Sequence, residues 1–416
     1  MHRLELAAVA DVTTPRSALE CPPAQEGTAQ RRSASAPVPE DPAGAAACNS
    51  SRQSGEVMET SCRTQGKEER EQAMEKLRGH LRRGSLGAVM IFALALPGAS
   101  SASPDRWRSE WPRTDFAKHS VDLDEIRSGG PPKDGIPAID HPRFERLEHG
   151  RAAGWSARLA PSEPVVSFVV ERDARAYPLR ILIWHEIVND VVGGVPVLVT
   201  YCPLCNSAIV FRRSTASGLL DFGTTGKLRH SDLVMYDRQT ESWWQQFSGE
   251  AIVGALTGTR LSLLPARLES FARFAKRFGD GLVLVPNDPG LRNYGRNPYV
   301  AYDRQGARPF LYDGSMPDGI EPMARVVAVE VEPGDHQAFA LSLLRERGEV
   351  RQGDVILRWS AGQSSALDAA IVDGGRDVGN VVVQRQMRGG FVDIPYDVTF
   401  AFAYHAFHPG SPIHTR

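Results

Sequence analysis

Val195-Pro-Val-Leu-Val-Thr-Tyr-Cys-Pro-Leu-Cys-Asn-Ser-Ala-Ile-Val-Phe211 contains two apolar runs separated by a short interruption. The first run, 195–201, is rich in β-branched residues and predicts a buried strand, and 208–211 predicts a second strand. The Pro-Leu pair between the two cysteines predicts a turn. This stretch therefore places Cys202 and Cys205 at a turn between two strands and indicates a β-rich protein.

Short strands dominate the sequence on both sides of this stretch. Alternating or β-branched runs predict strands at 165–170, 175–178, 219–222, 233–236, 251–253, 282–285, 326–331, 355–359, 381–384 and 398–402. Apolar spacing predicts helices at 268–278 and 336–347, and it fits a short helix about as well as a strand at 179–192. The segment 286–323 predicts a long loop, and no internal repeat is recognised. We expect a β-rich α+β fold of mixed or antiparallel strands with a few short helices, in one large domain or two intimate lobes.

The C-x-x-C pair is the strongest chemical signal, and three interpretations of it stay open. Two close thiols can form a redox couple, supply half of a metal site, or form a disulfide that pins the turn. A thioredoxin-like site places its second cysteine in a helix whose N-terminus lowers the thiol pKa, whereas a strand is predicted after Cys205. A structural zinc site needs four ligands, and the sequence has no second C-x-x-C. The other ligands would have to be His, Asp, Glu or residues of a second subunit.

The segment Trp184-His-Glu-Ile-Val-Asn-Asp190 lies shortly before the cysteines and carries the nearest candidate partners. It differs from the metalloprotease pattern H-E-x-x-H because position 189 is Asn. We expect His185 to act as a base or pKa-lowering group, with Glu186 or Asp190 orienting it. A helix would place these two acidic residues on one face. A purely structural histidine is the alternative.

Composition and motifs argue against several other functions. The 416 residues include 48 Lys and Arg and 50 Asp and Glu, without a long basic run, so we expect no nucleic-acid partner. Phe222–Asp232 predicts a Gly/Thr-rich loop with Lys227, Arg229 and His230, but it lacks the spacing of a phosphate-binding loop. The nucleophile motif G-x-S-x-G is absent from the sequence.

The N-terminal hundred residues differ in composition from the rest. Residues 1–73 are rich in Ala, Ser, Pro, Gln, Glu and Arg, which predicts disorder or a mis-assigned extension ahead of a true start at Met74. Residues 74–102 combine a basic flank, a short apolar run and small residues, the three parts of a secretory signal. The apolar run is too short for a stable transmembrane segment. We therefore expect cleavage after Ala102 and export to the periplasm or the cell exterior.

The exported chain would begin with a polar linker or arm, 103–133. Of five cysteines in the full sequence it retains only Cys202 and Cys205. In an oxidising compartment a single close pair is a disulfide, a redox couple or half of a metal site.

Six motifs occur in an order and spacing that resembles one known family. They are Arg175-Ala-Tyr-Pro-Leu, His185-Glu-Ile-Val-Asn-Asp, Val199-Thr-Tyr-Cys-Pro-Leu-Cys, Phe222-Gly-Thr-Thr-Gly, Leu233-Val-Met-Tyr-Asp-Arg-Gln-Thr and Trp244-Gln-Gln-Phe-Ser-Gly-Glu-Ala-Ile. Over residues 134–412 the chain resembles the domain of unknown function 3179 family of bacterial and archaeal proteins, which usually follow a signal peptide. Some members carry selenocysteine in the motif that matches Cys202-Pro-Leu-Cys205. Because selenocysteine serves mainly in redox chemistry, the resemblance favours a redox role, although this chain has sulfur at both positions.

The leading hypothesis is an exported oxidoreductase in which one thiolate of the Cys202/Cys205 pair attacks and the other resolves the mixed intermediate, with His185 as base. Its partner would be a protein thiol or disulfide. The second hypothesis is a copper or zinc module that uses Cys202, Cys205, His185 and Glu186 as ligands. The third is a non-catalytic scaffold whose cysteines form a structural disulfide.

Overall fold

The computed structural model describes residues 107–416, and most of their regular structure is short, mainly antiparallel strands. This confirms the predicted β-rich α+β class. The expected N-terminal extension 1–73 and signal peptide 74–102 lie outside the described residues. Within 107–416, none of the helices is both long and apolar enough to cross a membrane.

Two successive parts of the chain, here named the first and second repeats, have the same order of elements. The first repeat comprises β3 (Pro164–Val170), β4 (Asp173–Pro178), α3 (Leu179–His185), β5 (Ile187–Val192), β6 (Val195–Cys202), β7 (Ser207–Arg212) and, after an insertion, β15 (Arg267–Ser270), α4 (Phe271–Arg277) and β16 (Leu282–Val285). The second comprises β17 (Arg325–Glu332), β18 (Asp335–Ala340), α5 (Leu341–Arg347), β19 (Glu349–Gln352), β20 (Val355–Ser360), β21 (Asn380–Met387), β23 (Tyr396–Phe400), α6 (Ala401–Phe407) and β24 (Ile413–His414). The expectation of no internal repeat was wrong at the level of structure.

The sheets of the two repeats have matching strand orders. The first repeat forms β15-β3-β4-β16 and the second β23-β17-β18-β24, each with two antiparallel contacts followed by a parallel one. The remaining strands form the antiparallel meanders β5-β6-β7 and β19-β20-β21. Edge strands β2 (Arg143–Arg146), β14 (Leu263–Leu264) and β22 (Gly390–Asp393) extend these sheets. Many different apolar sequences satisfy one strand order, which explains why the repeat was not visible in the residues.

Backbone hydrogen bonds align the repeats residue by residue. The N–H of Glu186 donates to Leu182 O and its carbonyl accepts from Tyr201 N, just as Gly348 donates to Leu344 O and accepts from Trp359 N. After β15 and β23, the first two helical N–H groups likewise donate to equivalent carbonyls: Phe271 to Glu163, Ala272 to Pro161, Ala401 to Ala324 and Phe402 to Pro322. Glu186 therefore corresponds to Gly348, and Cys202 to Ser360.

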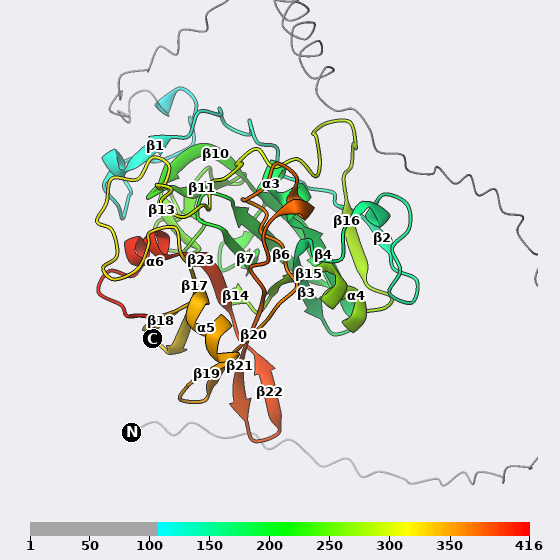
Figure 1. Ribbon diagram of the computed structural model, residues 1–416. Helices are drawn as coiled ribbons and strands as arrows, with labels where there is room; N and C mark the ends of the chain where they lie inside the picture. Colours follow the sequence, from blue (N-terminus) through cyan, green and yellow to red (C-terminus); the bar gives the residue numbers. More distant parts are fainter. Residues whose placement is uncertain (1–106) are drawn as a thin grey trace, which may run out of the picture. The chain divides into compact units, whose positions relative to one another are not determined.

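The two repeats pack against each other reciprocally. Strand β7 of the first repeat contacts β23 of the second, and β21 of the second contacts β15 of the first (Figure 1). One large apolar cluster includes residues from both, such as Leu198, Phe211, Phe339 and Phe400. The repeats thus share a core.

An insertion in the first repeat and one strand from the segment before that repeat form a separate five-stranded sheet. Its strands are β1 (Ile126–Ser128), β10 (Phe222–Arg229), β11 (Asp232–Asp237), β12 (Trp243–Gln245) and β13 (Glu250–Val253), in that order, and β8 (Ser214–Thr215) pairs with β9 (Gly218–Leu219) nearby. The segment predicted as a polar arm packs on this sheet, where Trp107 and Trp111 meet Trp243. This segment also contains the short 3-10 helix η1 (Leu123–Glu125), and further 3-10 turns occur at η2 (Ser156–Arg158) and η3 (Val372–Gly374).

The expected Gly/Thr-rich loop at Phe222–Asp232 is instead strand β10 and the start of β11. Its register against β11 shifts between Thr224 and Lys227, and Gly226 has a φ of 69° at this bulge. A Cβ at Gly226 would lie 1.9 Å from Pro131 O, so the glycine is required by close backbone contact. The bulge explains why glycine and threonine occur inside a strand.

The predicted helices begin later than expected. Each seven-residue helix follows a strand without a connecting loop, so Arg267–Ser270 and Asp335–Ala340 are strands rather than first helical turns. The same junction resolves 179–192, which is α3 followed by β5. The long loop predicted at 286–323 is confirmed, since the described chain has no helix or strand between β16 and β17.

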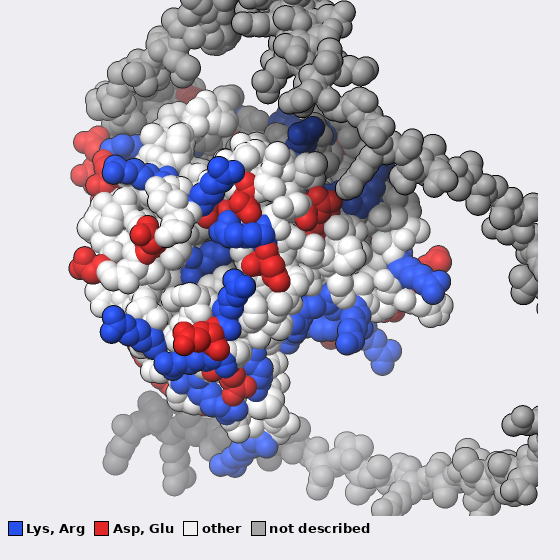
Figure 2. Space-filling model, viewed as in Figure 1, with Lys and Arg blue, Asp and Glu red and all other residues white. Residues whose placement is uncertain are grey.

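Charged side chains of both signs cover the face shown in Figure 2, and basic ones gather over the sheet β19–β22. Several of these arginines are paired: Arg351 and Arg358 with Glu349, and Arg385 with Asp354. The basic surface is therefore partly neutralised by carboxylates of the same sheet.

Candidate functional site

The two cysteines lie where β6 ends and turns back into β7. Cys202 is the last residue of β6 and pairs with Ser207, while Cys205 lies inside the turn. Asn206 donates its N–H to Pro203 O and adopts a φ of 54°, a conformation that is uncommon outside glycine. Both thiols are free and at most 1 % exposed. The predicted strand–turn–strand arrangement is confirmed.

Strand β23 of the second repeat holds the cysteine turn in place. Cys205 O accepts from Phe400 N at 3.0 Å and from Thr399 Oγ1 at 2.8 Å. Asn206 Nδ2 donates to Val398 O at 2.6 Å. A site on the first repeat is thus fixed by the backbone of the second.

Asp232, the first residue of β11, completes a three-residue cluster. Its carboxylate and the sulfur atoms of Cys202 and Cys205 supply ligand atoms that all lie within 4.8 Å of one another. Asp232 Oδ2 accepts from Gln245 Nε2 and Phe247 N, and both thiols also hydrogen-bond to the carboxylate. A buried carboxylate that two thiols approach without a neighbouring cation indicates a place for a proton or a cation.

The backbone that delivers Asp232 is itself unusual. His230 and Ser231 have φ values of 52° and 66°, and Ser231 O lies 3.9 Å from Cys202 Sγ. Together with Asn206 and Glu186, four non-glycine residues around the cluster have positive φ. Such conformations cost energy and concentrate at functional sites, which marks this region as a candidate site.

Burial shifts every acidic group of the cluster toward its protonated form. It raises the pKa of Asp232 to about 7, opposed by hydrogen bonds that include those from both thiols. Burial also raises the pKa of Cys202, and it raises that of Cys205 further. The largest influences on these pKa values include no lysine or arginine. At neutral pH both thiols therefore hold their protons, and Asp232 is about half protonated.

Glu186 lies beside this cluster at the C-terminal end of α3. Its φ is 58°, at the position that Gly348 occupies in the second repeat. Burial, followed by repulsion from Asp232, raises its pKa to about 8. A buried acid in a conformation suited to glycine indicates a functional requirement for the carboxyl group.

A cavity of about 300 Å³ opens next to Glu186. Leu204, the second residue between the cysteines, lines it together with Tyr299 and Tyr302 of the long loop. Burial, followed by the charge of Glu186 on Tyr299, raises the pKa of that tyrosine, and burial also raises that of Tyr302, so both hydroxyls stay protonated. Because Leu204 lies between the two cysteines in the chain, the cavity adjoins the cysteine turn.

His185 has other partners than the cysteines. Its Nδ1 lies 2.7 Å from Pro137 O and its Nε2 lies 2.8 Å from Tyr294 OH, whose ring stacks on the imidazole. Burial lowers the pKa of His185, so the ring is neutral at pH 7. The three-residue cluster of Cys202, Cys205 and Asp232 contains neither His185 nor Glu186.

The expected orienting role of Asp190 is not what the structure shows. Asp190 lies on β5, not on a helical face shared with Glu186, and it binds Arg175 and accepts from Tyr177 OH at 2.6 Å. Asp232 was missed although it ends the Gly/Thr-rich stretch. Only the pairing of β10 with β11 and the approach of β6 bring it to the sulfur atoms.

Fold and cluster define the class: a β-rich protein of two related repeats with a buried dithiol–carboxylate site. The chain belongs to the family described as "Protein of unknown function (DUF3179)", whose model matches residues 133–411. This confirms the resemblance and agrees with the expected bounds 134–412. Searches of curated proteins and of solved structures returned no significant match.

Proposed function

We propose that Cys202, Cys205 and Asp232 bind one zinc or copper ion. The observation that carries this proposal is the convergence of two sulfur atoms and one carboxylate oxygen within 4.8 Å in a buried site. Two thiolates on one tetrahedral zinc ion lie roughly 3.8 Å apart, given Zn–S bonds of about 2.3 Å. A small contraction of the cluster therefore suffices for coordination.

Electrostatics supports the same proposal. Four acidic groups, the two thiols with Asp232 and Glu186, lie together, and burial and mutual repulsion raise their pKa values. A divalent cation reverses this penalty because it stabilises the deprotonated forms that bind it. Soft thiolates favour zinc or copper over magnesium or calcium. Glu186 lies outside the three-residue cluster but lines the 300 Å³ cavity, so we expect it to exchange a proton with a molecule bound there.

Native mass spectrometry of the full chain, paired with a denatured mass from the same sample, tests the proposal. The expected result is one zinc or copper ion per chain that is lost on denaturation. Cys202→Ser and Asp232→Asn should each reduce occupancy at least tenfold, because each removes a ligand. A folded wild-type chain that stays metal-free after incubation with zinc or copper(I) would overturn the proposal.

His185→Ala provides the matched control. The histidine is close to the cysteines in sequence, but its ring nitrogens engage Pro137 O and Tyr294 OH. We therefore expect the variant to retain the ion while Asp232→Asn loses it. The opposite pattern would restore His185 as the third ligand.

A thiol–disulfide function is the second candidate, favoured by the contact of Asp232 with both thiols. With a pKa of about 7, Asp232 can accept the proton of Cys202, whose pKa is raised less than that of Cys205. The Cys202 thiolate would attack a small disulfide and release one thiol, and Cys205 would then displace the second thiol to close the Cys202–Cys205 disulfide. A metal-free chain lighter by about two hydrogens, with both cysteines linked, would favour this candidate.

We also propose that the protein is exported, on the strength of the signal-like pattern at 74–102. Expression of residues 74–416, which begin at the expected start Met74, in a bacterium and N-terminal sequencing of the periplasmic product test this. We expect a chain that starts at Ser103. Recovery of only full-length chain from the cytoplasm would contradict export.

A further inference from the structure

A cavity of about 600 Å³ is separate from the cysteine site and lies between the repeats. Strands β7 and β14 of the first repeat form one wall, and β17, β23 and α6 of the second form the other. Its size falls within the range of pockets that hold small organic ligands. None of the cysteine-cluster residues lines it.

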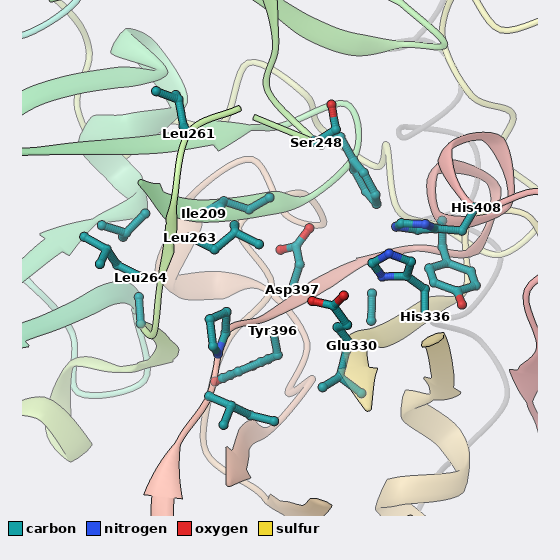
Figure 3. A pocket seen from close by; sticks show the side chains of 18 of the residues that line it. Ile209, Ser248, Leu261, Leu263, Leu264, Glu330, His336, Tyr396, Asp397 and His408 are labelled. Atoms are coloured by element: carbon teal, nitrogen blue, oxygen red, sulfur yellow. The ribbon is translucent and has the colours of Figure 1, made fainter. Parts of the chain in front are cut away.

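The cavity has an apolar side and a polar side. Figure 3 shows Ile209, Leu261, Leu263 and Leu264 gathered on one side. Glu330, His336 and His408 lie on the other side, and the carboxylate of Asp397 lies between the two groups (Figure 3). This arrangement suits a ligand with an apolar body and a polar head.

Asp397 is a buried charged group at the wall of the cavity. The residue is 7 % exposed, its Oδ1 accepts from Ala208 N at 2.9 Å, and hydrogen bonds from the Ser207 hydroxyl and the Val398 N–H also favour its ionised form. Burial raises the pKa of Asp397 to about 6, so the group is mainly ionised at neutral pH. A buried carboxylate held only by neutral donors is costly unless a cation meets it.

The residue at the equivalent position in the first repeat is charged and takes part in an ion pair within the chain. There β15 carries Arg267, which pairs with Asp393 at 2.6 Å. Among residues 107–416 no cationic side chain pairs with Asp397. The difference leaves its charge available to a cation from outside these residues.

The cationic side chains around the cavity have other partners. Arg385 binds Asp354 and donates to Val331 O, and Arg260 binds Glu250 at 2.6 Å while its side chain is 70 % exposed. The rings of His336 and His408 stack with centroids 4.0 Å apart, and burial, followed by the charge of His336, lowers the pKa of His408 to about 4. The His408 imidazole is thus neutral at pH 7 and does not compete for Asp397.

We propose that this cavity binds an organic monocation, an amine attached to an apolar body. The ammonium group pairs with Asp397 and lies near Glu330 at the more exposed end, while the apolar body packs on the leucine-lined wall. The neutral His408 imidazole offers an acceptor for one of the remaining N–H groups. This proposal is independent of a metal at the cysteine cluster.

Isothermal titration of the full chain with three matched probes tests the proposal. The probes are 2-phenylethylamine, 2-phenylethanol and 3-phenylpropanoate, which share one apolar body and differ in charge. We expect the amine to bind at least tenfold more tightly than the alcohol and the carboxylate to show no binding. Equal affinities for amine and alcohol, or binding of the carboxylate, would overturn the proposal.

Two variants locate the binding. Asp397→Asn keeps the acceptor for Ala208 N, removes the charge, and should reduce amine affinity at least tenfold with little change for the alcohol. Leu263→Arg changes a side chain that is 46 % exposed at the cavity wall, so it spares the core and should weaken amine binding by charge repulsion. Glu346→Gln on α5, outside the cavity, removes the same charge and serves as control. Unchanged amine affinity in both cavity variants, with unaltered thermal unfolding, would exclude this site.

Discussion

The two repeats share a scaffold but differ where chemistry is concentrated. At the end of the first helix, the first repeat has Glu186 and the second has Gly348. At the end of the second meander strand, the first repeat has Cys202 and the second has Ser360. A short turn connects the next strands in the first repeat, whereas residues 361–379 connect them in the second. The second repeat thus shows what the scaffold needs, and the departures from it mark residues kept for another purpose.

The comparison shows that the backbone strain at Glu186 is not required by the shared scaffold. A glycine at the helix end adopts a positive φ without cost, whereas the Cβ of a glutamate there is crowded against the backbone and lowers the stability of the fold. Glu186 also brings a carboxyl group into a buried cluster that already holds Asp232 and two thiols. Neither property stabilises the fold, so the first repeat gives up stability at the position where the second repeat does not.

The largest expected effect concerns a buried ion pair that only the first repeat has. Arg180 Nε donates to Glu163 Oε2 at 2.6 Å with both side chains buried, and burial still raises the pKa of Glu163 despite this pair. Arg180→Met leaves an unpaired buried carboxyl group and should lower the free energy of unfolding by about 3 kcal/mol, as measured by urea denaturation.

The second repeat supplies the control for this pair. It has Ala324 and Ser342 at the two positions, so the double change Glu163→Ala with Arg180→Ser copies a solution that already works there. We expect the double variant to recover most of the loss. A double variant less stable than Arg180→Met would show that the repeats are not equivalent at this site.

A smaller effect separates the repeats by acid sensitivity. Asp303 pairs with Arg325 at the start of β17, where the first repeat has Pro164, and with the partly exposed Arg376. Burial would raise the pKa of Asp303, but Arg325, Arg376 and Ser365 outweigh it and lower the pKa to about 2. Because the folded pKa is below the ordinary value, this stabilisation is present above about pH 4 and is lost as pH falls toward 2.

The expected loss from Asp303 is about 2 kcal/mol between pH 4 and pH 2, at about 1.4 kcal/mol per pKa unit. Denaturation curves at several pH values should show it in the wild type, and Asp303→Asn should show a flatter dependence over that range. Parallel curves for the two proteins would mean that Asp303 does not contribute this charge-dependent stability.

The smallest expected effect isolates the backbone strain at Glu186. Glu186→Gly and Glu186→Ala both remove the carboxyl group, but only glycine tolerates the positive φ, so the glycine variant should be more stable by about 1 kcal/mol. In the second repeat Gly348→Ala should cost about the same, because its φ is 73° and the added Cβ meets no atom within 4 Å. Thermal or urea unfolding of the three variants measures both differences, and a neutral Gly348→Ala would remove the argument from strain.

Much of the local structure followed from residue patterns. The β-branched runs on both sides of Cys202 and Cys205 predicted β6 and β7, and the Pro-Leu pair between the cysteines predicted the turn. The Pro- and Gly-rich composition of 286–323 predicted a loop. The errors have two causes. Strand β10 contains glycine at a bulge and was therefore mistaken for a loop, and helices α4 and α5 begin directly after strands, so a window of sequence there mixed two elements.

The sequence by itself determined that this is a β-rich protein with a dithiol turn between two strands, because side-chain periodicity and turn chemistry are local properties. Only the tertiary structure decided which groups surround that turn. Asp232 comes from another sheet and Tyr299 from the long loop. The backbone hydrogen bond to Cys205 comes from β23 of the second repeat. Asp397 likewise faces its cavity only because β23 packs beside β7. Convergence of this kind depends on how sheets pack against one another, and that packing leaves no periodic signal along the chain.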